Sequence, residues 1–91
     1  MNVNANERQI ADVLRYLTSW FDDGGSHVSR EEIEEVTKLP ADVVQRALDE
    51  LHDDGLVHAV VAAGRGRPTG VSHVLRLTPA GRRAGRQLPA G

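Results

Sequence analysis

The chain has 91 residues, 40% of them apolar and 26% charged, a balance typical of one folded domain rather than of a disordered segment. It has no cysteine, which excludes disulfides and thiolate metal sites, and no run of roughly 20 apolar residues that would suit a bilayer. We therefore expect a single domain over residues 1–91, cytoplasmic and without a membrane role, with an ordered core at about 4–83 and a frayed tail at 84–91.

The formal net charge of -2 hides a strong asymmetry along the chain. Residues 1–54 hold all 13 acidic residues and five of the 11 basic ones, for a net charge of -8, whereas residues 55–91 hold six arginines and no acid, for +6. Such asymmetry points to a polyanionic partner for the second part. The alternative is that the basic segment lies against the acidic helices of its own domain.

The first predicted element is an amphipathic helix over residues 4–21, capped at its start by Asn4 with Glu7. Its apolar residues recur at three- and four-residue spacing: Ile10, Val13, Leu14, Leu17 and Phe21. The stretch "DDGGSH" ends this helix, and His27-Val28 is expected to form a very short extended piece.

A second helix is predicted to begin at Ser29, because Ser29 and Glu32 have the spacing of a capping box. Ile33, Val36 and Leu39 are its expected buried residues.

Pro40 cannot continue that helix but suits the first turn of another, so "TKLPADVV" predicts helix, tight turn, helix. The third helix is expected over Pro40 to Asp54 and to end at Gly55 in the left-handed conformation. Its expected buried residues are Val44, Ala47, Leu48 and Leu51.

Two extended runs, 56–62 and 71–78, predict an antiparallel hairpin, with the eight residues between them forming a loop rich in glycine. Thr78-Pro79 is a plausible start for a short last helix, which Gly81 and Gly85 weaken. The predicted fold class is α+β, with three helices, a hairpin and a short C-terminal helix.

This order, together with "LPADVVQRALDELHDDGLV" and "LRLTPAGRR", resembles the winged helix-turn-helix regulators related to the MarR and PadR families over about residues 29–83. The resemblance implies a transcriptional regulator that binds double-stranded DNA, either sequence-specifically or with a preference for A·T-rich sites. It implies that the third helix, 40–54, lies in the major groove. The hairpin tip, 63–70, would lie on phosphates or in the minor groove, as the wing.

The outward positions of the third helix would then meet the bases or the backbone. They are expected to be Ala41, Asp42, Val43, Gln45, Arg46 and Asp49. Gln45 suits adenine and Arg46 suits guanine, whereas the two aspartates would be repelled by phosphates unless they accept from cytosine. The alternative for Arg46 is an ion pair with Asp42, Asp49 or Glu50 on a solvated face.

The sequence "RGRP", residues 65–68, is similar to the core of the AT-hook, a short minor-groove motif. A narrow groove concentrates negative potential that attracts an extended guanidinium, and glycine permits close approach. Minor-groove insertion of Arg65 and Arg67, simple phosphate contact and an uninvolved loop all remain open.

Further phosphate contacts near the wing are expected from Arg82, Arg83 and Arg86, which follow the last strand and could form one patch with it. The free amides at the start of the second helix are expected to add others. Four glutamates in residues 31–35 oppose approach from that side. The complete candidate DNA-binding set is Ser29, Arg30, Lys38, Ala41, Gln45, Arg46, Arg65, Arg67, Arg82 and Arg83.

No residue spacing suggests an enzyme, a cofactor site or a metal site. The histidines are scattered, although His58 and His73 lie on the two predicted strands and could face each other. Tyr16, Trp20 and Phe21 on the first helix are expected either in the core or in a homodimer interface. The alternative function is a protein-interaction module whose acidic helical face, Glu31 through Asp54, docks on a basic partner.

Overall fold

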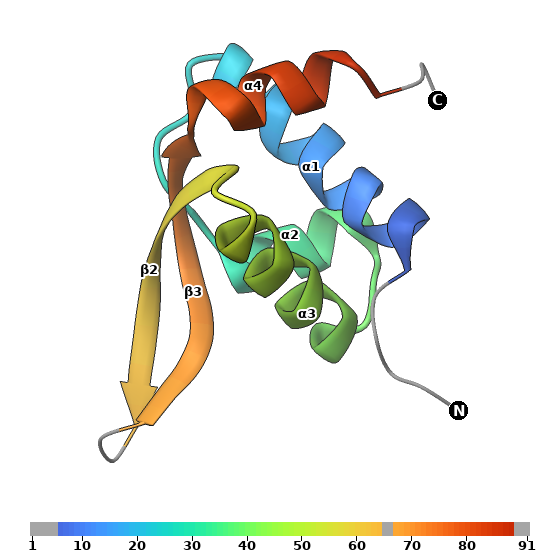
Figure 1. The fold of residues 1–91 in the computed structure, drawn as a ribbon. Helices are drawn as coiled ribbons and strands as arrows, with labels where there is room; N and C mark the ends of the chain where they lie inside the picture. The colour runs from blue at the N-terminus through green and yellow to red at the C-terminus, as the bar shows by residue number, and fades with distance from the viewer. Residues whose placement is uncertain (1–5, 65–66, 89–91) are drawn as a thin grey trace.

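The computed structural model describes residues 6–64 and 67–88, with the backbone alone described at 64 and 67–69. The elements in chain order are α1 (Glu7–Asp22), β1 (Val28–Ser29), α2 (Arg30–Thr37), α3 (Ala41–Asp53), β2 (Val57–Gly64), β3 (Arg67–Leu77) and α4 (Pro79–Arg86). The first three helices pack together, the β2–β3 hairpin lies beside α3 and projects past it, and α4 begins where β3 ends (Figure 1).

Helix α1 begins at Glu7 rather than at residue 4. Its N-cap is Asn6: the Gln9 amide donates to Asn6 Oδ1 at 2.9 Å, and the Asn6 amide donates to Gln9 Oε1 at 3.0 Å. The cap predicted from Asn4 and Glu7 is therefore wrong, because the reciprocal pair forms two residues further along; Asn4 itself lies outside the described residues.

Helix α2 begins as predicted, with the Glu32 amide donating to Ser29 Oγ at 3.2 Å. Ile33 is fully buried, but Val36 is 57% exposed, so the prediction that Val36 is buried is wrong. The helix has only eight residues and ends at Thr37, followed by Lys38 in the left-handed region (φ 60°). The inward face of α2 runs through Arg30, Ile33 and Thr37, and Val36 lies outside it.

Helix α3 supplies much of the core. Its buried residues are Val43, Val44, Ala47, Leu48 and Leu51. Val43 is only 8% exposed, which corrects its prediction as an outward residue. The helix stops at Asp53, and Gly55 follows with φ 71°, as predicted.

The hairpin is longer than predicted, because the expected eight-residue loop is mostly paired strand. Ala62 pairs with Gly70, Ala63 with Pro68 and Gly64 with Arg67. Three register shifts interrupt the ladder, and at each the additional residue belongs to β3: Thr69, Ser72 and Leu75. Gly64, Pro68 and Gly70 therefore belong to an irregular strand pair rather than to a loop, since bulges accommodate residues that a regular ladder does not.

Strand β1 pairs with β3, giving the sheet order β1-β3-β2. Buried residues of α1, α2 and α3 pack against Val57, Val71, Val74 and Leu77 of the sheet. At the base of the hairpin, the Thr78 amide donates to Leu56 O at 3.0 Å and the Gly81 amide donates to Thr78 Oγ1 at 3.0 Å. These bonds attach α4 to the start of β2.

Candidate functional site

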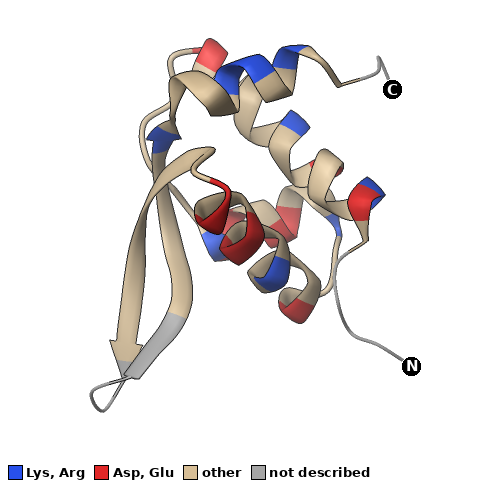
Figure 2. Ribbon diagram, in the orientation of Figure 1, with Lys and Arg blue, Asp and Glu red and all other residues tan. Residues whose placement is uncertain are grey.

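The outward face of α3 is predominantly acidic. Its exposed residues are Ala41, Asp42, Arg46, Glu50, His52 and Asp53. Arg46 forms no ion pair with any residue in the described ranges, so the alternative in which Arg46 is neutralised by Asp42, Asp49 or Glu50 is not observed. Arg46 is thus the one arginine or lysine that α3 presents to solvent (Figure 2).

Two other polar side chains of α3 bond to β3. Asp49 Oδ1 accepts from the Val71 amide at 2.9 Å and from Gln45 Nε2 at 3.1 Å, and Gln45 Nε2 also donates to Val71 O at 3.0 Å. Both side chains are half-buried. Because hydrogen bonds to a carboxylate are stronger than neutral ones, this contact holds β3 against α3 at a defined position.

Arg30 extends the same network from α2. Its Nη1 donates to Gln45 Oε1, its Nε lies 3.2 Å from Glu34 Oε2, and its Nη2 lies 3.4 Å from Glu31 Oε1. The contact with Glu34 is an ion pair between buried atoms whose geometry falls short of a hydrogen bond. We call Arg30, Gln45, Asp49 and the Val71 backbone the α2–α3–β3 network.

Gly70 makes the close approach of β3 to α3 possible. Its φ is 104°, and a Cβ there would lie 2.5 Å from Gln45 Nε2 and 3.0 Å from Asp49 Oδ1. A side chain at this position would therefore be strained and would collide with the network. Sequence reasoning assigned Gly70 to a loop; its glycine identity was the only signal of a close backbone approach.

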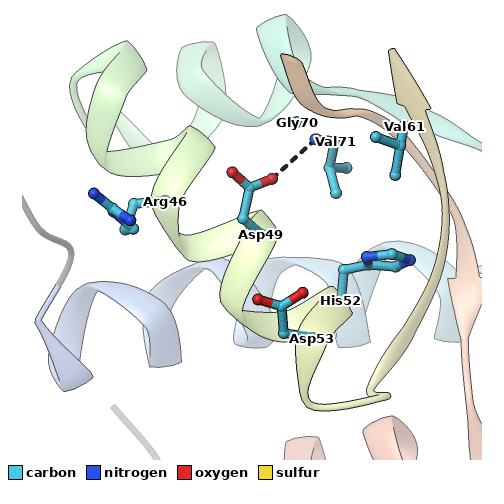
Figure 3. A pocket seen from close by; sticks show the side chains of 7 residues that line it. All are labelled: Arg46, Asp49, His52, Asp53, Val61, Gly70 and Val71. Carbon is cyan, nitrogen blue, oxygen red and sulfur yellow. Dashed lines mark hydrogen bonds between the residues drawn. The ribbon is translucent and has the colours of Figure 1, made fainter. Parts of the chain in front are cut away.

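A groove of about 540 Å³ separates α3 from the hairpin (Figure 3). It is lined by Arg46, Asp49, His52 and Asp53 of α3 and by Val61, Gly70 and Val71 of the hairpin. In Figure 3 the Asp49 carboxylate points across the groove to the Val71 amide, whereas Arg46 lies further along α3.

The remaining candidates on the helices occupy two places. Ser29 is half-buried in β1, where its Oγ caps α2. Lys38 and Ala41 are both exposed and flank the turn between α2 and α3.

Of the two wing arginines, the structure describes only the backbone of one. Arg65 is outside the described residues, and Arg67 is the first residue of β3, with only its backbone described. The predicted AT-hook contact therefore also falls outside them. Since β2 has eight residues, the tip lies about 25 Å from the hairpin base at the usual strand rise.

Arg82 and Arg83 are exposed on α4, which begins at the hairpin base. Figure 1 shows α4 and the tip at opposite ends of the hairpin. The expectation that the arginines of residues 82–86 form one patch with the wing is therefore wrong, because the strands separate them.

Where the side chains are described, the arginines of the basic second part form no ion pair with the acidic helices. All ion pairs found among the described residues lie within residues 1–54. The cationic residues Arg76, Arg82, Arg83 and Arg86 form none with that part of the chain. Figure 2 shows the basic residues along α4 and the acidic residues concentrated on α2 and α3.

The predicted facing of His58 and His73 across the hairpin is not observed. His58 pairs across the hairpin with Arg76 and not with His73; His73 instead pairs with Val60 and Ser29, and its ring contacts that of His27 at 6.2 Å between centroids. In residues 6–64 and 67–88 no three histidine or carboxylate side chains gather as a metal site would require.

Tyr16, Trp20 and Phe21 pack against the core while remaining half-buried. Burial raises the pKa of Tyr16, and the negative charge of Glu32 raises it further. Self-association through α1 stays a prediction. None of the described helices has the length and apolarity to cross a membrane.

Comparison with solved structures identifies the architecture. AF1382 from Archaeoglobus fulgidus superposes with a TM-score of 0.69 at 17% identity, over 90% of this chain and 81% of the other. A provisionally described DNA-binding protein from Ralstonia eutropha JMP134 superposes with a TM-score of 0.66 at 25% identity, over 94% of this chain and all of the other. The fold is a winged helix.

No protein-family model matches the sequence, and comparison with curated proteins gives no match. In this winged helix, α2 and α3 form the helix-turn-helix and the β2–β3 hairpin is the wing.

Proposed function

We propose that this winged helix binds double-stranded DNA and acts as a transcriptional regulator rather than as an enzyme. The observation that carries the proposal is the wing: a two-stranded ribbon that projects past α3 (Figure 1) and whose far end holds Arg67. The structural similarity to the provisionally described DNA-binding protein from Ralstonia eutropha supports the same function.

In the proposed complex, the wing arginines Arg65 and Arg67 meet phosphates or the minor groove. Arg46, Ala41 and Lys38 approach the duplex from α3 and the preceding turn, where all three are exposed. Arg46 is the residue best suited to a base edge, because guanidinium groups bind guanine in the major groove through two hydrogen bonds.

Three other candidates act indirectly in this proposal. Ser29 caps α2, and Arg30 and Gln45 join α3 to its neighbours, so each stabilises the DNA-binding surface from within. Arg82 and Arg83 belong to α4, which begins at the other end of the hairpin and lies outside the proposed duplex contact.

Salt dependence of duplex binding tests the proposal. If Lys38, Arg46, Arg65 and Arg67 each neutralise one phosphate, log K falls with log salt at a slope of about -4. Anisotropy of a labelled duplex at several salt concentrations measures this slope. Undetectable binding at low salt would reject the proposal.

A second candidate function is protein interaction through the acidic helical face, Glu31 through Asp54. The acidic outward surface of α3 favours it, since Asp42, Glu50 and Asp53 surround Arg46 and would repel phosphates. Changing Arg65 and Arg67 to Glu discriminates the two functions: DNA binding would be lost under the first and capture of a basic protein partner would persist under the second.

A further inference from the structure

A second concave site lies at the base of the hairpin, away from the proposed duplex contact. This basal pocket has a volume of about 330 Å³ and is lined by His58, Arg76, Leu77, Pro79 and Arg82. From His58 to the tip at Gly64 the strand spans about 20 Å at the usual rise per residue. The basal pocket is therefore independent of the wing tip.

The lining of the basal pocket is cationic in a chain whose net charge is -2. It includes two arginines and a histidine but no carboxylate. Arg76 and Arg82 are exposed and form no ion pair with the residues that the structure describes. Their charge is thus uncompensated, and a concave site with one sign of charge concentrates ions of the opposite sign.

Two of the three basic side chains come from the outer face of the hairpin. His58 and Arg76 are cross-strand partners, and both are exposed. Their chain neighbours Val57 and Leu77 are buried. Since successive strand residues point to opposite faces, His58 and Arg76 project from the face opposite the core.

The third, Arg82, is brought to the pocket by the first turn of α4. The Arg82 amide donates to Thr78 O at 2.9 Å, and Thr78 Oγ1 donates to Gly55 O at 2.7 Å. A Cβ on Gly81 would lie 1.9 Å from Leu56 O, so only glycine allows this turn to pack so closely. The backbone that carries Arg82 is therefore held before any ligand arrives.

We propose that the basal pocket binds the phosphate group of a small phosphate monoester. A tetrahedral dianion offers three oxygens, which match two guanidinium groups and an imidazole better than the two oxygens of a carboxylate do. Pro79, which is exposed, supplies apolar contact for the rest of the molecule. The volume falls at the lower end of the range for small-molecule sites, roughly 300–1,000 Å³.

Titration of the full chain with methyl phosphate at a pH above the second phosphate pKa, followed by amide and side-chain NMR, tests the proposal. We expect saturable binding with shifts confined to the basal pocket. Arg76→Gln and Arg82→Gln should each raise Kd at least tenfold. Arg83→Gln is the matched control: it removes the same charge from the next residue of α4, outside the pocket, and should change Kd less than threefold.

Three results would overturn the proposal. The first is an equal loss of affinity for methyl phosphate in Arg83→Gln, which would mean that the anion is attracted to the basic helix in general. The second is acetate binding as tightly as methyl phosphate. The third is displacement of methyl phosphate by duplex DNA, which would assign the basal pocket to nucleic-acid phosphates. If a variant unfolds, the residues whose NMR signals shift in the wild-type chain still show where methyl phosphate binds.

Discussion

Helix α3 and the hairpin hold the two candidate DNA-contacting surfaces, and they use their polar side chains differently. On α3, Gln45 and Asp49 bond to Val71 of β3, while the exposed remainder is mostly carboxylate. The hairpin carries no acidic residue at all. The half-buried polar side chains of α3 therefore anchor the wing, and most of the attraction for DNA should come from the wing itself.

The largest expected effect comes from removing the charge of the wing tip. Changing both Arg65 and Arg67 to Gln should weaken duplex binding by about 30-fold or more, since the loss of two contacts worth about 1–3 kcal/mol each removes at least about 2 kcal/mol. Fluorescence anisotropy measures the change. The double variant R83Q/R86Q removes the same charge from α4 and should bind duplex within about threefold of wild type. Equal losses of affinity in the two double variants would mean that the wing contributes no more to binding than α4 does.

The anchoring role of α3 predicts a loss of stability at Asp49. Asp49→Ala removes the acceptor for the Val71 amide and for Gln45 Nε2, and should lower the free energy of unfolding by about 1.5–3 kcal/mol. Urea denaturation measures it. Asp53→Ala is the control, because Asp53 lines the same groove but is exposed; its effect should stay within about 0.5 kcal/mol.

A smaller effect is expected from the exposed carboxylates of α3. Neutralising them as D42N/E50Q/D53N should strengthen duplex binding about threefold to tenfold, because like charge near phosphates weakens association. Binding measured at two salt concentrations tests whether the increase in affinity is electrostatic, since an electrostatic increase should shrink at high salt. Unchanged affinity would mean that α3 does not approach the duplex.

The smallest effect is expected on the pKa of Tyr16, which burial and the negative charge of Glu32 both raise. As the single tyrosine, it gives an unambiguous absorbance titration, and its midpoint should lie above the ordinary tyrosine pKa of 10.0. Glu32→Gln should lower the midpoint partway, leaving the contribution of burial.

Because this pKa is raised on folding, the stability linked to Tyr16 is fully present below the unfolded-state pKa and is lost as pH rises through the folded-state value. Tyr16→Phe should abolish that alkaline loss. A midpoint in Glu32→Gln identical to that of wild type would contradict the charge effect.

Much of the fold was predictable from local patterns. The three- and four-residue spacing indicated α1 and α3, and Ser29 with Glu32 marked the start of α2, because these signals act within a turn or two of helix. Exposure of Arg46 and Ala41 followed from the same periodicity. The sequence alone thus determined the order of elements and the charge of each part.

Which candidate side chains are exposed and which are bonded within the fold depends on contacts between distant segments. Asp49 and Gln45 bond to a residue 22 and 26 positions away, Val36 lies outside the inward face of α2, and three additional residues of β3 interrupt the strand pairing. Such contacts depend on where distant segments meet. Periodicity predicts which side of an element a residue occupies but not which residue contacts it there. Gln45 was therefore predicted to face DNA, although its side chain bonds to the neighbouring strand.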